Sequence, residues 1–314
     1  MTALEALATK LAGRVERDVP LGPLTTYRVG GPAALAVRLE DERTLGEVLA
    51  AVRAEHVPIL VVGKGSNLLV SDVGFPGLAV VLGEAFADVE IVGTSVRAGG
   101  AASLPVVARR TAAEGLTGFE WAVGVPGSVG GAVRMNAGGH GSDMAASLRR
   151  VRVADLELGE DGEMTVAELD LGYRRSAIRR AQIVLRADLD LVAGDRAAAE
   201  HEIREIVRWR RENQPGGANA GSVFTNPPGD SAGRLIETAG ARGLRLGSAA
   251  VSTKHANFIQ ADEGGSAADV VALMAEVRRR VADETGARLA PETRLEGFAP
   301  EELGAMGLRR PDED

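Results

Sequence analysis

The stretch that decides the fold is residues 115–141, GLTGFEWAVGVPGSVGGAVRMNAGGHG, in which small residues fill the middle and apolar residues the flanks. Because glycine has no Cβ, main-chain N–H groups in such a stretch can approach a ligand closely. Ser128 can cap a short helix over 132–137, whose N-terminus favours an anion. The tight turns are expected at Gly124, Gly127, Gly130 and Gly131. This pattern predicts a cradle for a pyrophosphate.

The glycine spacing separates this stretch from the dinucleotide motif of Rossmann folds. Its order, Gly124-x-x-Gly127-x-x-Gly130, is not G-x-G-x-x-G, and no long βαβ crossover follows it. A glycine run of this kind is equally typical of structural turns that bind nothing. The glycine spacing by itself is compatible with both interpretations.

Composition places the chain among ordinary globular proteins. It has 314 residues, of which 45% are hydrophobic and 25% charged, so two or three domains are expected. Its net charge of −8 argues against a nucleic-acid surface, which needs an excess of Lys and Arg. The absence of cysteine excludes disulfides, thiolate zinc sites and thiol catalysis.

No metal site and no membrane segment is expected. The histidines are too scattered to form a metal cluster: His56, His140, His201 and His255. The first 20 residues lack an apolar core followed by a cleavage site, and no apolar run approaches the ~20 residues that span a bilayer. We therefore expect a cytoplasmic protein.

A β-α-β unit leads to a second glycine-containing loop. After a helix over 3–15, strands over 34–39 and 58–62 flank a helix over 44–55. The last strand ends in GKGSNLLVSD, residues 63–72, and ligands often bind where strands end. The order and spacing of a P-loop are absent. A plain turn into a strand over 78–82 is an equal alternative, and the first domain is expected to end near residue 83.

The middle of the chain reads as a mainly antiparallel β structure with helices. A hairpin over 87–100 turns at Gly93-Thr94, and a helix over 103–114 leads into the glycine-rich stretch. A strand over 148–158 alternates, and another follows over 183–191. Between them DLGYRRSAIRR, residues 170–180, holds a cluster of arginines. A helix capped by Asp195 runs to about residue 211.

The last part of the chain is expected to form a further domain. Its border is the Pro- and Gly-rich segment 214–230, where Ser222 follows a glycine but no G-x-S-x-G elbow exists. The expected elements are a helix over 231–239, a strand over 246–251, a long helix capped by Ser266 and a final strand over 290–298. The charged tail to residue 314 is expected to fray.

Six motifs, taken in order, resemble those of the UDP-N-acetylenolpyruvoylglucosamine reductase family. They are TTYRVGGPA (25–33), GKGSNLLV (63–70), GVPGSVGGAVRMNAG (124–138), GYRRS (172–176), AGSVFTNP (220–227) and APETRLEG (290–297). Each motif is unspecific by itself, but six in the same order cover nearly the whole chain. Members of this family are flavoenzymes that make UDP-N-acetylmuramate for peptidoglycan.

The resemblance implies the fold class and the domains. It implies an α+β protein with a two-subdomain FAD-binding module of the PCMH or vanillyl-alcohol-oxidase type, followed by an α+β substrate-binding domain. The expected borders are 1–83 and 84–211 for the FAD-binding subdomains, 212–298 for the substrate-binding domain and 299–314 for the tail. The implied reaction is the NADPH-dependent, FAD-mediated reduction of UDP-N-acetylglucosamine-enolpyruvate.

The resemblance also implies which residues act. The catalytic positions fall on Arg174, Ser222 and Glu292. The positions that bind non-covalent FAD fall on Gly63, Lys64, Gly65, Ser66, Asn67, Leu68, Pro126, Gly127, Ser128, Gly131 and Asn136. Substrate contacts are expected from Tyr173, Arg210 and Asn226.

Two departures from the family pattern bear on the site. The family often has Asn-Ala-Gly-Ala-Tyr after the second flavin loop, whereas this chain has NAGGH, ending in His140. Residues 183–213 contain no tyrosine, so the chain resembles the branch without a tyrosine-bearing insert, and a more open substrate cleft is expected. The alternatives are an alcohol or sugar oxidase with the same FAD fold, and a binding module that has lost catalysis.

Overall fold

The structure, a computed structural model, describes residues 1–309 and divides into two compact units. The first unit comprises residues 1–18, 34–64 and 77–210, and the second comprises 19–33, 65–76 and the residues from 211 onward. Two short segments from the N-terminal part of the chain thus belong to the unit that holds the C-terminal part. The borders expected near residues 83 and 211 stay predictions.

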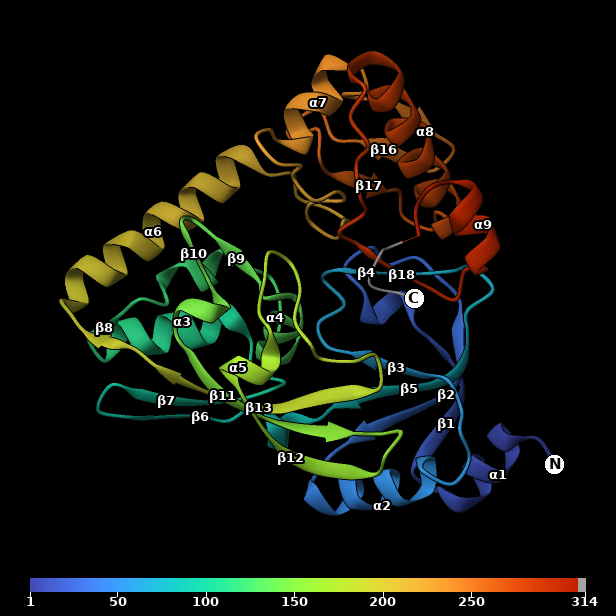
Figure 1. Cartoon of the computed structure of the whole chain (residues 1–314), viewed down its shortest axis with the longest axis vertical. Coiled ribbons are helices and arrows are strands. Elements are labelled where there is room, and N and C mark those ends of the chain that lie inside the picture. Colours follow the sequence, from blue (N-terminus) through green and yellow to red (C-terminus); the bar gives the residue numbers. More distant parts are fainter. Residues whose placement is uncertain (310–314) are drawn as a thin grey trace. The chain divides into compact units, whose positions relative to one another are not determined.

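The first unit contains a four-stranded sheet in the order β1-β2-β5-β3, with β3 and β5 parallel (Figure 1). Its elements are α1 (Ala3–Lys10), β1 (Val15–Pro20), β2 (Pro32–Leu39), α2 (Glu42–Val52), β3 (Ile59–Val62) and β5 (Phe75–Leu82). Alternate residues of β2 are buried, as in a sheet with one face on a core. Leu45 and Val48 of α2 belong to that core. The strand-helix-strand order expected from the sequence is confirmed, with β5 lying between β2 and β3 in the sheet.

The same unit contains a five-stranded antiparallel sheet in the order β12-β11-β13-β7-β6. Its strands are β6 (Val89–Val92), β7 (Ser95–Gly99), β11 (Leu148–Asp155), β12 (Glu160–Thr165) and β13 (Gln182–Asp190). The hairpin turn at Gly93-Thr94 is confirmed by the pairing of Val92 with Ser95. Val151 and Val153 of β11 are buried, as the alternating pattern predicts.

The first unit also contains several smaller elements, four of which lie within the glycine-rich stretch 115–141. They are α3 (Leu104–Ala113), α4 (Val129–Met135), α5 (Val166–Leu169), the strand pairs β8 (Leu116–Thr117) with β14 (Val192–Ala193) and β9 (Gly138–Gly139) with β10 (Ser142–Asp143), and the 3-10 turns η2 (Glu84–Phe86), η3 (Glu120–Gly124) and η4 (Met144–Ala146). Ser128 caps α4 as expected, although α4 begins at Val129 rather than at residue 132.

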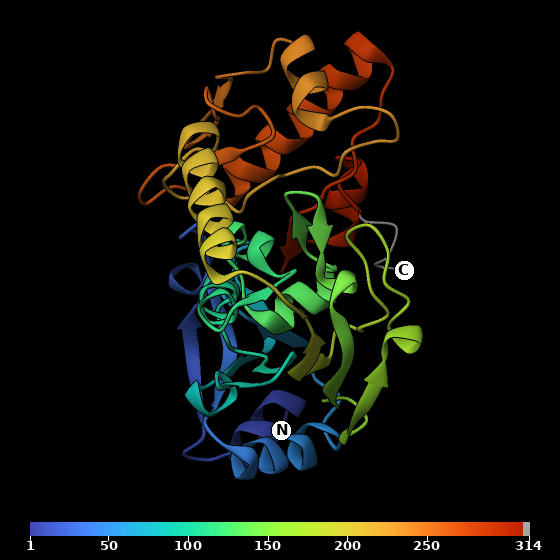
Figure 2. The same ribbon diagram turned by 90° about the vertical axis from the view of Figure 1, so that its left-hand side faces the viewer.

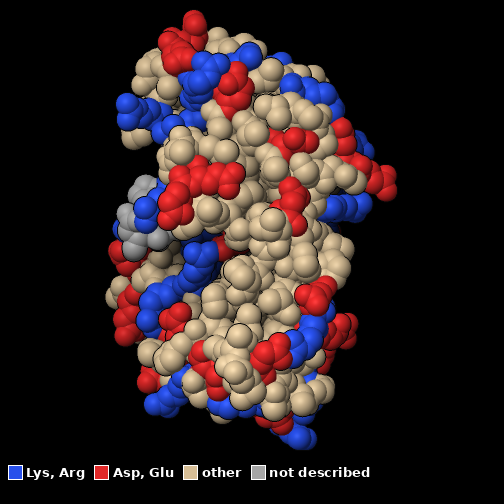
Figure 3. Space-filling view, turned by 90° about the vertical axis from the view of Figure 1, so that its right-hand side faces the viewer, with Lys and Arg blue, Asp and Glu red and all other residues tan. Residues whose placement is uncertain are grey.

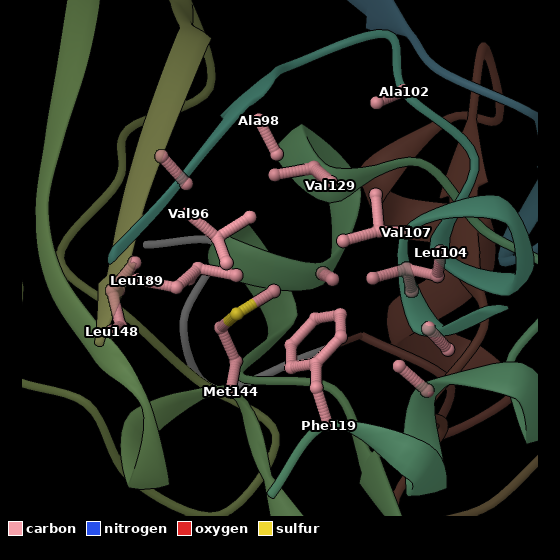
Figure 4. Close-up of a cluster of buried hydrophobic side chains, with 14 of the residues drawn as sticks. Val96, Ala98, Ala102, Leu104, Val107, Phe119, Val129, Met144, Leu148 and Leu189 are labelled. Carbon is pink, nitrogen blue, oxygen red and sulfur yellow. The ribbon is translucent and has the colours of Figure 1, made fainter. Parts of the chain in front are cut away.

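Apolar residues in and next to the glycine-rich stretch belong to one of the two hydrophobic clusters of this unit. Phe119, Val129 and Met144 lie among side chains of β7 and β13, including Val96 and Leu189 (Figure 4). All five are buried, and burying a large apolar side chain stabilises a fold by about 1.5–3 kcal/mol. Buried side chains on both sides of the glycines therefore hold the loop between them in place.

The long helix α6 (Arg196–Asn213), yellow in Figures 1 and 2, begins after Asp195. The Asp195 carboxylate accepts a hydrogen bond from the N–H of Ala198 at 2.8 Å, so the expected cap is confirmed. Ile203 and Ile206 are buried in the core of the first unit. The rest of the helix is mostly polar and exposed.

The second unit combines a small sheet with helices. Its elements are η1 (Gly22–Leu24), β4 (Leu68–Val70), α7 (Ala232–Thr238), β15 (Arg245–Leu246), β16 (Ala249–Val251), β17 (Ile259–Ala261), α8 (Ala267–Thr285), β18 (Arg294–Glu296) and α9 (Pro300–Ala305). β15, β16 and β17 form an antiparallel sheet, and β4 pairs with β18 in parallel. Val270 and Met274 of α8 pack in the core with Tyr27 and Leu69.

Several expected elements were wrong in extent. Helix α1 ends at Lys10, not at residue 15, because Gly13 adopts a φ of +78° and the chain then enters β1. The last strand covers only Arg294–Glu296, so Glu292 lies ahead of it. Strands β1 and β12 were not predicted because most of their residues are exposed and show no apolar alternation.

The expectation of a frayed tail was wrong for residues 299–309. Pro300 begins α9, and the side chains of Leu303 and Leu308 are buried in the core of the second unit. Residues 310–314 lie outside the described part of the chain. Apolar burial therefore orders this segment despite its charged composition.

The charged side chains form mixed networks. Figure 3 shows Lys and Arg interspersed with Asp and Glu over the face that it presents. On the five-stranded sheet, for example, Arg150 contacts both Glu163 and Asp188. Exposed pairs of this kind contribute about 0–1 kcal/mol each, so they bear on solubility more than on the fold.

Candidate active site

The end of β3 meets the glycine-rich stretch within the first unit. A Cβ built on Gly63 would lie 2.6 Å from the hydroxyl oxygen of Ser128, so a side chain at residue 63 would collide with it. Gly63 and Gly131 are both exposed, whereas Ser128 is buried. The two predicted flavin loops thus meet at a surface where each exposes a glycine. Such a surface suits a group that must approach the backbone closely.

The N–H groups at the start of α4 are donors within the protein. Val129 donates to the carbonyl of Ala102 and Gly130 to that of Gly100, both at 2.9 Å. Gly131 donates to the Ser128 hydroxyl at 3.4 Å. These three amides thus have partners within the protein, and the anion cradle expected at this turn stays a prediction. What the glycines provide here is close packing.

Gly65 is required by the backbone of the second unit. Its φ is +60°, and a Cβ would lie 2.1 Å from the carbonyl oxygen of Leu24. Its own carbonyl accepts a hydrogen bond from the N–H of Thr26. A structural reason therefore suffices for this glycine, whether or not it also contacts a cofactor.

Asn67 joins the first predicted flavin loop to the segment of Glu292. Its side-chain amide donates to the carbonyl of Glu292 at 3.1 Å, and its own carbonyl accepts from the N–H of Arg294 at 3.0 Å. The parallel pairing of β4 with β18 continues this contact. A residue that was predicted to bind FAD therefore also places the predicted catalytic glutamate.

Arg174 lies at the tip of a tight turn in the first unit. Gly172 and Arg175 form a backbone bridge around Tyr173 and Arg174, and Arg174 adopts a φ of +57°. Its guanidinium donates to the carbonyl of Gly138 at 3.1 Å. The Cζ atom also lies 5.3 Å from the centre of the Tyr173 ring, a cation–π contact. Tyr173 itself is 60% exposed.

Asn136 fastens this turn to the end of the glycine-rich stretch. It ends α4 in the left-handed conformation, with a φ of +38°, and is buried. Its side-chain amide donates to the carbonyl of Gly172 at 3.0 Å and to Asp143, and its oxygen accepts from the N–H of Ala145. The polar atoms of Asn136 thus serve the protein itself, and its predicted FAD contact stays a prediction.

Ser222 and Glu292 lie on paired segments of the second unit. The N–H of Glu292 donates to the carbonyl of Val223 at 2.7 Å, and Phe224 and Pro291 form a β-bridge. Both Ser222 and Glu292 are partly buried. The structure therefore brings two of the three predicted catalytic residues into neighbouring positions. That Arg174 acts together with them stays a prediction.

The predicted substrate contacts differ in their surroundings. Asn226 is exposed, and its side-chain oxygen accepts from the N–H of Ala232 at 3.0 Å, at the start of α7. Arg210 is partly buried, and this burial lowers its pKa. The two residues lie in different units. Their contact with a substrate stays a prediction.

His140, which departs from the family pattern, has a structural role that the sequence did not predict. Its ring packs edge-on against Trp209 of α6, with ring centres 5.1 Å apart, and lies against Gly124. Burial and the nearby charge of Arg210 both lower the pKa of His140. The histidine therefore ties β9 and η3 to α6. No sequence signal indicated this contact, because the partners are about 70 residues apart.

None of the helices within residues 1–309 is long and apolar enough to cross a membrane. No group of three or more His, Cys, Asp or Glu side chains in the same residues is arranged to hold a metal ion.

Most of the chain is similar to known proteins. Residues 33–165 match an FAD binding domain, and residues 213–295 match the C-terminal domain of UDP-N-acetylenolpyruvoylglucosamine reductase. A UDP-N-acetylenolpyruvoylglucosamine reductase of Heliobacterium modesticaldum is 44% identical over 288 residues, which are 91% of each chain. The chain belongs to the UDP-N-acetylenolpyruvoylglucosamine reductase family.

Other members of the reductase family support the assignment and the fold. A reductase of Symbiobacterium thermophilum is 42% identical over 92% of this chain and 94% of its own length. The crystal structure of the Thermus caldophilus reductase superimposes with a TM-score of 0.78 at 37% identity, over 90% of this chain and 99% of that one. The predicted α+β fold class with an FAD-binding module is thereby confirmed.

Proposed function

We propose that the chain is an FAD-dependent reductase that uses NADPH to reduce the enolpyruvyl group of UDP-N-acetylglucosamine-enolpyruvate. The product is UDP-N-acetylmuramate, a precursor of peptidoglycan, so the reaction serves cell-wall biogenesis, cell shape and cell division. The observation that carries the proposal is the 44% identity to a reductase over 91% of both chains. The two matched domains include both proposed flavin loops, Ser222 and Glu292.

The proposed flavin site uses two loops. Residues Gly63, Lys64, Gly65, Ser66, Asn67 and Leu68 form the first, and Pro126, Gly127, Ser128, Gly131 and Asn136 belong to the second. The exposed glycines Gly63 and Gly131 leave the backbone of both loops open to the close approach of a cofactor, which supports this site. The chain has no cysteine, and the first loop has no histidine, so we propose that FAD binds non-covalently.

When bound, FAD accepts a hydride from NADPH and passes it to the enol-ether double bond of the substrate. Negative charge then builds on the neighbouring substrate carbon and spreads into the substrate carboxylate. We assign Arg174 to that carboxylate, because a guanidinium can donate two parallel hydrogen bonds to it. A cation held in place by Gly138 stabilises the developing charge more than the ground state.

Ser222 is the proposed proton donor. Its hydroxyl is a weak acid, but a carbanionic carbon is a strong base, and a placed donor contributes about 10²- to 10⁴-fold in rate. Glu292 carries no positive charge, so its proposed role is to orient the serine hydroxyl or the carboxylate through a shared proton. Its main-chain bond to Val223, the residue after Ser222, supports this role.

The remaining assignments follow from the same function. Tyr173, Arg210 and Asn226 are proposed to contact the nucleotide sugar. Because the nucleotide substrates are cytoplasmic metabolites, we propose a cytoplasmic protein that needs neither nucleic acid nor a membrane for its reaction. We also propose the more open substrate cleft expected from the lack of a tyrosine in residues 183–213.

A flavin spectrum tests the function directly. The purified protein is expected to be yellow, to bleach when NADPH is added without oxygen, and to recover its absorbance when the enolpyruvyl nucleotide sugar follows. Bleaching of the oxidised flavin by simple alcohols or sugars, with recovery when oxygen is admitted, would instead favour an oxidase. A colourless protein that takes up no added FAD would contradict the proposal.

A further inference from the structure

We propose that Asn257 is a positioning residue for Ser222, acting through the backbone of residues 223–225. This inference rests on the proposed role of Ser222 as proton donor. Asn257 lies in the turn between β16 and β17, and its side chain is buried, with 3% exposed. The hydrogen bonds of its side-chain amide go to main-chain groups of Phe224, in the segment that follows Ser222.

Asn257 satisfies three of the four main-chain groups of the two residues that follow Ser222. Its side-chain N–H donates to the carbonyl of Phe224 at 2.8 Å, and its side-chain oxygen accepts from the N–H of Phe224 at 3.0 Å. Its own main-chain carbonyl accepts from the N–H of Val223 at 2.9 Å. The carboxamide thus pairs with Phe224 as a neighbouring strand would.

The opposite side of the same segment pairs with the segment of Glu292. The remaining group, the carbonyl of Val223, accepts from the N–H of Glu292 at 2.7 Å. Thr225 donates to the carbonyl of Ala290 at 2.9 Å. Residues 223–225 therefore lie between Asn257 on one side and residues 290–292 on the other. Ser222 directly precedes Val223, so its position depends on the hydrogen bonds that hold residues 223–225.

The turn that carries Asn257 is itself fixed. The N–H of Asn257 donates to Nδ1 of His255 at 3.3 Å, and the N–H groups of Lys254 and His255 lie 3.1 and 3.4 Å from the Ser252 hydroxyl. Ser252 also donates through its N–H to the carbonyl of Phe258. A carboxamide on such a turn can hold a partner segment to within a fraction of an ångström.

Loss of a hydrogen bond between Asn257 and Phe224 should affect only the half-reaction in which the substrate is reduced. A displacement of about 1 Å at a reacting group can cost about 10²-fold in rate. Protonation of the substrate carbon needs Ser222, whereas reduction of the flavin by NADPH does not. A weaker hold on residues 223–225 should therefore slow the second half-reaction alone.

The test is Asn257→Asp in the FAD-loaded enzyme. The carboxylate keeps an acceptor for the N–H of Phe224 but loses the donor to its carbonyl. Stopped-flow absorbance should show flavin reduction by NADPH at the parent rate and reoxidation by the enolpyruvyl nucleotide sugar slowed about 10- to 100-fold. Hydrogen exchange of the peptide containing residues 222–225 should become faster in the protein without FAD, which is a readout independent of activity.

The control is Gln260→Glu, the same amide-to-carboxylate change on β17, where the side-chain N–H donates to the carbonyl of Gly216 at 2.8 Å. We expect both half-reactions of Gln260→Glu to run at the parent rates. The double variant Ser222→Ala/Asn257→Asp should reoxidise no more slowly than Ser222→Ala, because both changes act on one step. If Asn257→Asp does not fold, Asn257→Ser takes its place in the same measurements.

Three results would overturn the inference: additive losses in the double variant, equal losses in both half-reactions, or parent rates together with unchanged exchange of residues 222–225. These outcomes differ from failure of the proposed function. If the parent protein binds no FAD or is not reoxidised by the nucleotide sugar, the function fails first. If the parent protein does both and Asn257→Asp behaves like it, only the role of Asn257 fails.

Discussion

At the residue scale, Arg174 is held in a conformation that most side chains avoid. Its φ of +57° lies in the left-handed region, where a residue with a Cβ is strained by about 1–2 kcal/mol. Glycine would relieve this strain, so an arginine here indicates that the turn presents a guanidinium. The bond to Gly138 and the contact with Tyr173 then limit where that guanidinium can lie.

Replacement of Arg174 by lysine should lower substrate turnover without unfolding the protein. Lysine keeps one charge but not the planar pair of donors, so we expect kcat/KM for the nucleotide sugar to fall about 10²- to 10³-fold. Steady-state kinetics and thermal unfolding measure the two effects. Arg175→Lys is the matched control, because Arg175 is exposed and paired with Asp170. Equal losses in both variants would refute the assignment.

Replacement of Ser222 by alanine should separate the two half-reactions. The change removes the proposed proton donor, so reoxidation of the flavin by substrate should slow by about 10²- to 10⁴-fold while reduction by NADPH is unchanged. Stopped-flow absorbance follows both. Ser222→Cys, which keeps an acidic proton, should recover part of the loss. Parent-like reoxidation in Ser222→Ala would remove this role from Ser222.

At the element scale, helix α8 depends on a residue from a distant segment. Its first turn is capped by Ser266, and the carboxylate of Asp72 accepts hydrogen bonds from the N–H groups of Ala267 and Ala268 at 2.8 and 2.9 Å. A carboxylate at this position also compensates the helix dipole. The loop after β4 is thereby fastened to the longest helix of the second unit.

Loss of this cap should destabilise the second unit. We expect Asp72→Ala to lower the free energy of unfolding by about 0.5–2 kcal/mol, because two N–H groups lose their acceptor. Denaturant unfolding measures the change. The control Asp262→Ala removes an exposed pair with Arg245 and should stay within about 0.5 kcal/mol of the parent. Similar losses in both variants would mean that the cap contributes little.

Protonation of His255, in the turn before β17, should make the free energy of unfolding depend on pH. Burial lowers the pKa of His255 below its ordinary 6.5, Glu237 raises it and Arg242 lowers it. Because the unfolded chain then binds a proton more readily, His255 contributes most above pH 6.5, and its contribution is lost as the pH falls below that value. Protonation at Nδ1 would also remove the acceptor of the Asn257 N–H.

Unfolding measured from pH 7.5 to 5 checks this dependence. The parent protein should lose stability as the pH falls, and His255→Gln should lose less over the same range. Some dependence should remain in that variant, because the pKa of His140 is lowered as well. A variant curve as steep as that of the parent would exclude His255 as a contributor.

At the scale of the whole molecule, each unit has a core built from distant parts of the chain. The core of the second unit combines Tyr27 and Leu69 with residues of α8. The side chains of Tyr27 and Leu69 are both fully buried. The second unit therefore cannot be produced by cutting the chain at a single border, and the chain must be studied whole.

A non-covalent cofactor should come off when the molecule unfolds and should stabilise it when bound. Heat denaturation is expected to leave free flavin in the supernatant. Adding FAD to the protein without cofactor at about 100 times Kd should raise its stability by about 2.7 kcal/mol, seen as a higher Tm. Riboflavin, which lacks the pyrophosphate and adenosine, is the control and should raise Tm less. Flavin that stays on the denatured chain would indicate a covalent bond.

The amino-acid sequence alone determined the family, the fold class and most of the elements. Apolar periodicity placed α2, α3, α6 and α8, because a helix with one buried face repeats its pattern within a few residues. Ser266 and Asp195 were correctly predicted as caps for the same reason, since a cap bonds to N–H groups two or three residues away. Six ordered motifs indicated the family without any three-dimensional information.

The tertiary structure alone decided what several of these residues do. The carboxamides of Asn67 and Asn136, which are also proposed to contact the cofactor, hold Glu292 and Gly172, partners 225 and 36 residues away. Asn257 had no signal at all, because its partner Phe224 is 33 residues earlier in the chain. A pattern in sequence reports neighbours within a few residues, whereas a buried carboxamide takes whichever donor and acceptor the packed fold brings to it.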